Sequence, residues 1–99
     1  MSKADCDEIR TKLRRHLPDL KARFGVRTLE LFGSYVRHEN RADSDLDLLV
    51  TFDRTPGLLR FIELENSLSD LMGLKVDLVL RDSLKPAIGR QVLAEALPV

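Results

Sequence analysis

The stretch of residues 45–80 constrains the fold more than any other part of the chain. It contains two apolar segments of strand type, residues 45–52 and 76–80, on either side of a segment of helical type, residues 58–72. A strand, a crossover helix and another strand make a βαβ unit, in which the two strands run parallel. We therefore expect these two strands to lie parallel in a small sheet with the helix packed against it.

The chain before this unit is expected to add two helical pieces and a strand. Apolar side chains recur at steps of three and four, but Pro18 interrupts them. We therefore expect a helix over about 4–16 and a second helical piece over about 18–24, with Gly25 as its C-terminal cap. Residues 26–32 alternate as a strand does.

Two further helices complete the expected fold. Residues 35–39 can make a helix of a turn or two, and Ser83 is a candidate N-cap for a last helix. That helix would place five apolar residues inward: Ile88, Val92, Leu93, Ala96 and Leu97. The expected fold is α/β (α+β), with a small mixed three-stranded sheet flanked by about four helices.

Size and composition exclude several classes of protein. The 99 residues are expected to form a single domain over 1–99, and 43% of them are hydrophobic, which is too many for a disordered chain. The 16 basic and 16 acidic residues cancel, which argues against bulk binding of nucleic acid. No long apolar stretch or signal peptide is evident, and the single cysteine cannot form an internal disulfide, so we expect a cytoplasmic location.

Three carboxylates are candidate metal ligands. Asp45 and Asp47 are two residues apart on a predicted strand, so their side chains point to one face, and Asp77 joins them there if the next strand is adjacent. Alternating carboxylates also occur on solvated strand faces. However, three convergent carboxylates repel one another unless cations intervene. Mg²⁺ prefers such oxygen ligands, and two ions can activate an attacking oxygen and stabilise a leaving one.

A glycine-serine pair after the first strand is a candidate phosphate-binding turn. Gly33 allows close approach of a phosphate to the backbone, and Ser34 adds a hydroxyl donor. The start of the expected short helix would offer free N–H groups. Arg37 can supply a charge-assisted contact to a phosphate. A phosphate anchor and a metal site would then lie on adjacent elements.

The two features together resemble the signature of the DNA polymerase beta-like nucleotidyltransferase superfamily. The resemblance rests on Gly33-Ser34-x-x-Arg37, on the string Ser-Asp-Leu-Asp-Leu-Leu-Val at 44–50, and on Asp77 in a later strand. The short chain is most similar to the minimal nucleotidyltransferases, the MNT class. Their C-terminal tract also resembles residues 84–86 and 92–96, so that the resemblance covers about residues 8–97.

The resemblance implies a role for each matched residue. Asp45 and Asp47 would bind two Mg²⁺ ions, and Asp77 would bind one of them and help to deprotonate the acceptor hydroxyl. The glycine-serine turn would hold the β- and γ-phosphates of ATP, supported by Arg37. The family often has glycine after this arginine, whereas His38 stands here, and a non-glycine residue is expected to disfavour a positive φ.

The resemblance also implies a partner. MNT proteins are commonly paired with HEPN ribonuclease toxins, and some transfer AMP from ATP to a toxin tyrosine. The leading expectation is therefore an adenylylating antitoxin of a type VII-like toxin-antitoxin pair. This suits a chain of 99 residues, which leaves little room for a lobe that binds the acceptor.

Two alternatives remain open. The chain could be an antitoxin that neutralises its partner by complex formation alone, and His38 and the apolar residues of the segment 58–72 favour this reading. It could also be a nucleotidyltransferase that modifies a small molecule. That function needs an acceptor pocket, for which the chain is short.

Overall fold

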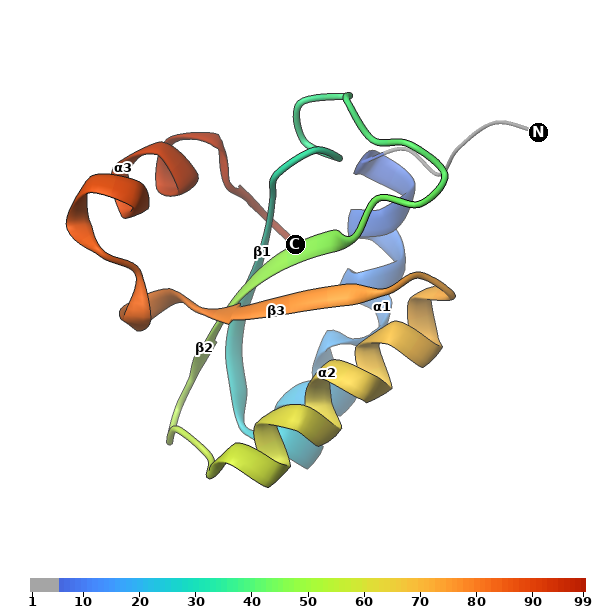
Figure 1. Cartoon of the computed structure of the whole chain (residues 1–99). Helices are drawn as coiled ribbons and strands as arrows, with labels where there is room; N and C mark the ends of the chain where they lie inside the picture. The colour runs from blue at the N-terminus through green and yellow to red at the C-terminus, as the bar shows by residue number, and fades with distance from the viewer. Residues whose placement is uncertain (1–5) are drawn as a thin grey trace.

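A mixed β-sheet organises the chain, which the computed structural model describes from residue 6 to residue 99 (Figure 1). Its strands are β1 (Val26–Phe32), β2 (Leu46–Phe52), β3 (Val76–Leu80) and β4 (Leu97–Pro98), in the spatial order β3-β2-β1-β4. As predicted, β2 and β3 run parallel, and β1 is antiparallel to β2 and β4. The expected sheet of three strands lacked β4, because two residues are too few to show an alternating pattern.

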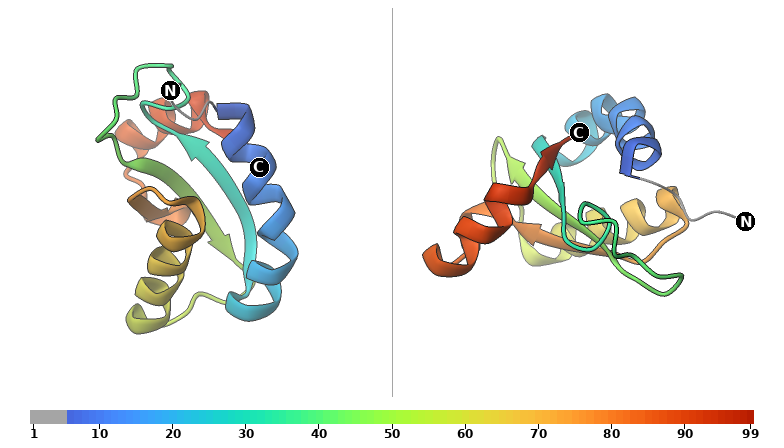
Figure 2. Two further views of the ribbon diagram at one scale, coloured as in Figure 1. Left: turned by 90° about the vertical axis from the view of Figure 1, so that its right-hand side faces the viewer. Right: turned by 90° about the horizontal axis from the view of Figure 1, so that it is seen from above.

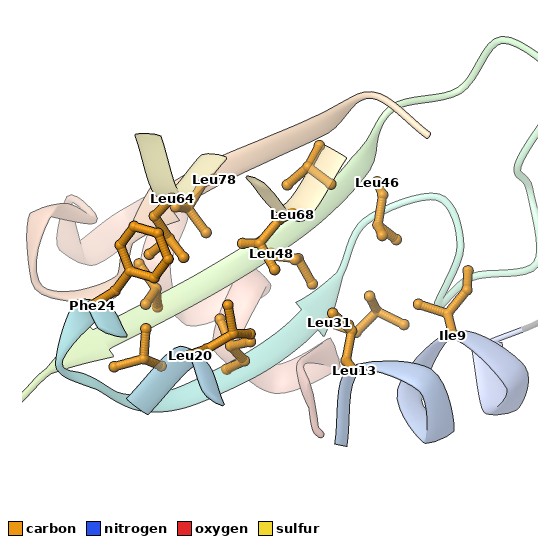
Figure 3. Packing of buried hydrophobic residues seen from close by; sticks show 14 of the residues in the cluster. Ile9, Leu13, Leu20, Phe24, Leu31, Leu46, Leu48, Leu64, Leu68 and Leu78 are labelled. Carbon is orange, nitrogen blue, oxygen red and sulfur yellow. The ribbon is translucent and has the colours of Figure 1, made fainter. Parts of the chain in front are cut away.

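Two helices, α1 (Cys6–Phe24) and α2 (Leu58–Met72), pack on one face of the sheet (Figure 2). The bounds predicted for α2 are confirmed, since Leu58 begins it and Gly73 caps it with φ 65°. Side chains from both helices and three strands meet in one core, as Figure 3 shows for Ile9, Leu13, Leu20, Phe24, Leu31, Leu46, Leu48, Leu64, Leu68 and Leu78. The opposite face of the sheet therefore remains available for polar groups.

The first helix is continuous, so the predicted break at Pro18 is wrong. Pro18 lies inside α1, and Leu13 and Leu20 on either side of it are both buried. A proline within a helix costs about 3 kcal/mol, and burial of a large apolar side chain contributes about 1.5–3 kcal/mol, so the shared buried face outweighs the break. Gly25 caps the helix as predicted, with φ 72° and its N–H donating to the Lys21 carbonyl. The predicted start at residue 4 lies outside the described residues.

Residues 35–39 form turns and not the predicted short helix. The Arg37 N–H donates to the Gly33 carbonyl at 3.2 Å, but the helical path ends at His38, whose φ is 58°. The left-handed conformation that we expected a non-glycine residue to disfavour is therefore present. Histidine is among the residue types enriched in this region, and a single left-handed residue stops a helix from continuing.

The last helix, α3 (Pro86–Glu95), lies on the side of the sheet away from the core (Figures 1 and 2). The predicted N-cap at Ser83 is wrong, because Ser83 belongs to a short 3-10 helix, Arg81–Ser83, and its hydroxyl donates to the Leu80 carbonyl at 2.7 Å. Only part of the predicted inward face packs. Ile88 and Leu93 are 58% and 40% exposed, and Gly89 is the only residue of α3 that is buried.

Within residues 6–99, no helix combines the length and the apolar character that crossing a bilayer requires.

Candidate functional site

Two of the predicted metal ligands lie side by side on the face of the sheet opposite the core. Asp47 of β2 is paired in register with Asp77 of β3. Leu46 and Leu48, which flank Asp47, are fully buried in the core, so the alternation of the strand directs Asp47 to the other face. Neighbouring strands are about 4.8 Å apart, which brings the two carboxyl groups within interaction range. The adjacency on which the role of Asp77 depended is confirmed.

Asp45 lies one residue before β2, and its charge acts on Asp47. Its carboxylate is 4.0 Å from Nζ of Lys75, and both side chains are largely exposed, so this ion pair contributes little to stability. Burial, and then the charge of Asp45, raises the pKa of the Tyr35 hydroxyl. Tyr35 is buried in the hydrophobic core, as expected of a packing residue.

The cluster makes Asp47 a weaker acid. Partial burial of the carboxyl is the main cause, and the charges of Asp77 and then Asp45 add to it, so that the pKa of Asp47 rises from 3.8 to about 6. Arg37 opposes the shift, and Glu95 adds to it. The ionised form of Asp47 is thus disfavoured by its neighbours, and a cation among the carboxylates would favour it.

The donors of the cluster fit a divalent cation that prefers oxygen. Mg²⁺ takes one or two protein carboxylates together with phosphates and water, and Asp47 and Asp77 in register offer such a pair. Within the part of the chain that is described, residues 6–99, no three Asp, Glu, His or Cys side chains are grouped closely enough to hold a metal as they stand. Asp45 lies beside Lys75 instead.

The predicted phosphate turn lies directly against this cluster. Gly33 follows β1 with φ 82°, and a methyl group at its Cα would overlap the Asp47 carboxylate. Glycine is therefore required here twice, once for the backbone conformation and once for the close approach. Asp47 and the turn share one space, so a phosphate held at the turn would lie beside the carboxylates.

A carboxylate from α3 already contacts the turn. The Gly33 N–H donates to Oε2 of Glu95 at 2.6 Å, and the Arg37 guanidinium donates to Oε1 and Oε2 at 3.1 and 3.0 Å. Arg37 also contacts Glu39 at 3.3 Å, and its hydrogen bonds with Glu39 and Glu95 raise its pKa. Glu95 is thus a residue of the site that the sequence analysis missed. It is 62 positions from Gly33, and no local pattern links the two.

The sequence matches the family description "Nucleotidyltransferase domain" over residues 13–98. The chain belongs to the nucleotidyltransferase domain family. The predicted enzyme class is thereby confirmed, and with it the expected mixed fold, although one strand more and fewer helices are present than expected.

Relatives of this nucleotidyltransferase are similar over its whole length. Protein adenylyltransferase MntA of Thermococcus cleftensis is 50% identical over 99 residues, covering 100% of both chains. A solved structure provisionally described as a minimal nucleotidyltransferase is 40% identical, with a TM-score of 0.79 and complete coverage of both chains. A toxin-antitoxin structure with AMP-PNP is 26% identical, with a TM-score of 0.74, over 90% of this chain and 70% of that one.

Proposed function

We propose that this nucleotidyltransferase is a Mg²⁺-dependent protein adenylyltransferase, which transfers AMP from ATP to a tyrosine hydroxyl of a HEPN toxin and so acts as its antitoxin. The observation that carries the proposal is the contact between the Gly33 turn and Asp47, with Asp77 in register beside it. A phosphate anchor and a pair of carboxylates thus share one space, as transfer of a nucleotide requires.

The relatives support the choice of nucleotide and acceptor. The 50% identical relative is named for protein adenylylation, and a similar solved structure is a toxin-antitoxin complex with an ATP analogue. The HEPN class of toxin and the tyrosine acceptor come from the resemblance of the sequence to MNT antitoxins.

Each residue of the site has a proposed part in the transfer. Asp45, Asp47 and Asp77 would hold two Mg²⁺ ions, which when bound polarise the α-phosphate and neutralise the triphosphate. The Gly33 turn, with its serine, and Arg37 would orient the β- and γ-phosphates. The acceptor oxygen would bond to the α-phosphorus while the bond from that phosphorus to the pyrophosphate oxygen breaks, and the hydroxyl proton would pass to Asp77.

Intact-mass measurement of the partner tests the proposal. The protein is incubated with a HEPN toxin, ATP and Mg²⁺, and the toxin is expected to gain the mass of one or more AMP units on tyrosine. Asp45→Ala combined with Asp47→Ala should abolish the gain. Asp53→Ala is a matched control, since this exposed aspartate follows the far end of β2. A toxin of unchanged mass under all nucleotides would refute the proposal.

Neutralisation by binding alone is the second candidate, and the surface of α2 favours it. Leu58 and Leu59 are 74% and 78% exposed, and Ile62 lies on the same exposed stretch at 40%. Adjacent exposed apolar residues of this size are typical of surfaces that bind a partner. The double aspartate variant separates the two functions. If it still protects cells fully from the toxin, binding alone is sufficient.

A further inference from the structure

Glu95 lies where the strand pairing places it, at the phosphate turn. Leu97 of β4 pairs with Leu31 of β1 in antiparallel register. Glu95 is the last residue of α3, two residues before Leu97, and its carboxylate reaches the N–H of Gly33, which lies two residues beyond Leu31. Arg10 of α1 holds the end of β4 through the Pro98 carbonyl at 2.9 Å. The position of Glu95 thus depends on the sheet as well as on α3.

The contacts of Glu95 are those of a bound anion. Its carboxylate accepts a hydrogen bond from the buried backbone N–H of Gly33 at 2.6 Å, and two from the Arg37 guanidinium at 3.0 and 3.1 Å. A phosphate group uses the same donors, because backbone N–H groups at a turn and arginine are the usual ligands of phosphoryl oxygens. One N–H cannot donate a full hydrogen bond to both a carboxylate and a phosphate. A carboxylate 3 Å from a phosphate would also repel it.

We propose that Glu95 is an internal substitute for a phosphate of the nucleotide, which keeps Gly33 and Arg37 oriented and leaves them when the triphosphate arrives. The inference rests on the proposed function, since it assigns the same turn to the β- or γ-phosphate. Glu95 would then lower the affinity for ATP without taking part in the transfer. It is a positioning residue, acting through Arg37 and the Gly33 N–H.

The Glu95 carboxylate can leave the phosphate turn without disturbing the rest of the fold. The Glu95 side chain is 24% exposed and ends α3, and the sheet holds the chain beyond it through two residues of β4. Movement of this carboxylate into solvent needs a rotation of its side chain and leaves the core of α1 and α2 untouched. Arg37 keeps a second carboxylate partner, Glu39, when Glu95 leaves.

Glu95→Gln tests the inference, because glutamine keeps the shape and one acceptor but loses the charge. A neutral acceptor binds these donors less strongly than a carboxylate, so ATP should displace it more easily. We expect affinity for ATP, measured by calorimetry with Mg²⁺, to rise about five-fold, equivalent to about 1 kcal/mol. KM for ATP should fall by the same factor while kcat is kept.

Glu39→Gln is the matched control. It removes one negative charge from the same arginine, but Glu39 has no contact with the Gly33 N–H among the hydrogen bonds of residues 6–99. ATP affinity should change less than two-fold. Equal gains in both variants would mean that only general charge matters, and they would overturn the inference. So would an unchanged or weaker affinity in Glu95→Gln.

A measurement on the unaltered protein covers the case in which Glu95→Gln fails to fold. The amide resonance of Gly33, assigned by NMR, should shift on titration with ATP, and with inorganic tripolyphosphate, in step with the side-chain signals of Glu95. Binding of ATP that moves Gly33 but leaves Glu95 in place refutes displacement. No binding of ATP at all refutes the proposed function instead, so the two failures are distinguishable.

Discussion

Replacing Asp47 by asparagine should stabilise the fold while abolishing the activity. The pKa of Asp47 is raised from 3.8 to about 6, so the folded chain binds this proton more tightly than the unfolded chain does. Each pKa unit corresponds to about 1.36 kcal/mol, so for a fully buried group this shift would lower the free energy of unfolding at neutral pH by about 3 kcal/mol. Asp47 is only partly buried, and solvent screening reduces the gain to about 1–2 kcal/mol.

The sign of the effect fixes its pH window. Well below pH 3.8, Asp47 is protonated in both the folded and the unfolded state and carries no penalty. Between pH 4 and pH 6 the folded state loses stability relative to the variant, and above pH 6 the full penalty applies. Asp47→Asn should therefore be close to the natural protein in free energy of unfolding at pH 4 and exceed it at pH 7.5.

Urea unfolding at pH 4, 6 and 7.5, in the presence of a chelator, measures the difference in the free energy of unfolding. Mg²⁺ should stabilise the natural protein more than the variant, because Asp47 is a proposed ligand. A variant that is less stable at pH 7.5, or a difference that does not change with pH, would refute the assignment of repulsion to this cluster. A chain that gains stability but keeps full activity would refute its proposed catalytic part.

Four further substitutions, at three positions, have defined outcomes. Gly33→Ala should lower the free energy of unfolding by about 1–3 kcal/mol and remove transfer activity, because the added methyl group overlaps the Asp47 carboxylate and the backbone has a positive φ. Urea unfolding measures the loss of stability, and the mass assay measures the loss of activity. His38→Gly should change the free energy of unfolding by less than about 1 kcal/mol, because glycine adopts the left-handed conformation without strain but loses more conformational entropy on folding. His38→Val should lower the free energy of unfolding by about 1–2 kcal/mol, because a β-branched side chain is strained at this φ. Thermal unfolding measures both changes. Leu59→Ser should leave stability within about 0.5 kcal/mol but weaken toxin binding at least five-fold in calorimetry, and unchanged binding would remove α2 from the interface.

The parts of the fold that the sequence predicts well are those with a repeating pattern and a clear end. The α2 helix and β3 have both, so their bounds agree with the prediction. The parallel run of β2 and β3 followed from the βαβ rule, and the structure adds the register that pairs Asp47 with Asp77. In contrast, the helix break predicted at Pro18 was wrong, because local helix propensity does not include the buried apolar face that continues on both sides of this residue.

The contact of Glu95 with Gly33 could not be predicted in the same way. It depends on β4, a strand of two residues that pairs with β1, and on a register that only the folded sheet provides. The conformation of His38 is a similar case. The general rule for non-glycine residues argued against a positive φ, but the hydrogen bonds of the turn around Gly33 accompany the conformation found.

The alignment of β2 with β3 has a consequence for how such proteins diverge. The same register that buries Leu48 beside Leu78 sets Asp47 beside Asp77. A slip by one residue would turn the carboxylates inward and the leucines outward, so it would destroy the fold together with the site. Descendants of this chain can therefore lose catalysis and survive only by replacing the side chains themselves. A lineage that came to rely on binding alone would keep this backbone. Such proteins would be recognised by substitutions at the aspartate positions of a sheet whose register is unchanged.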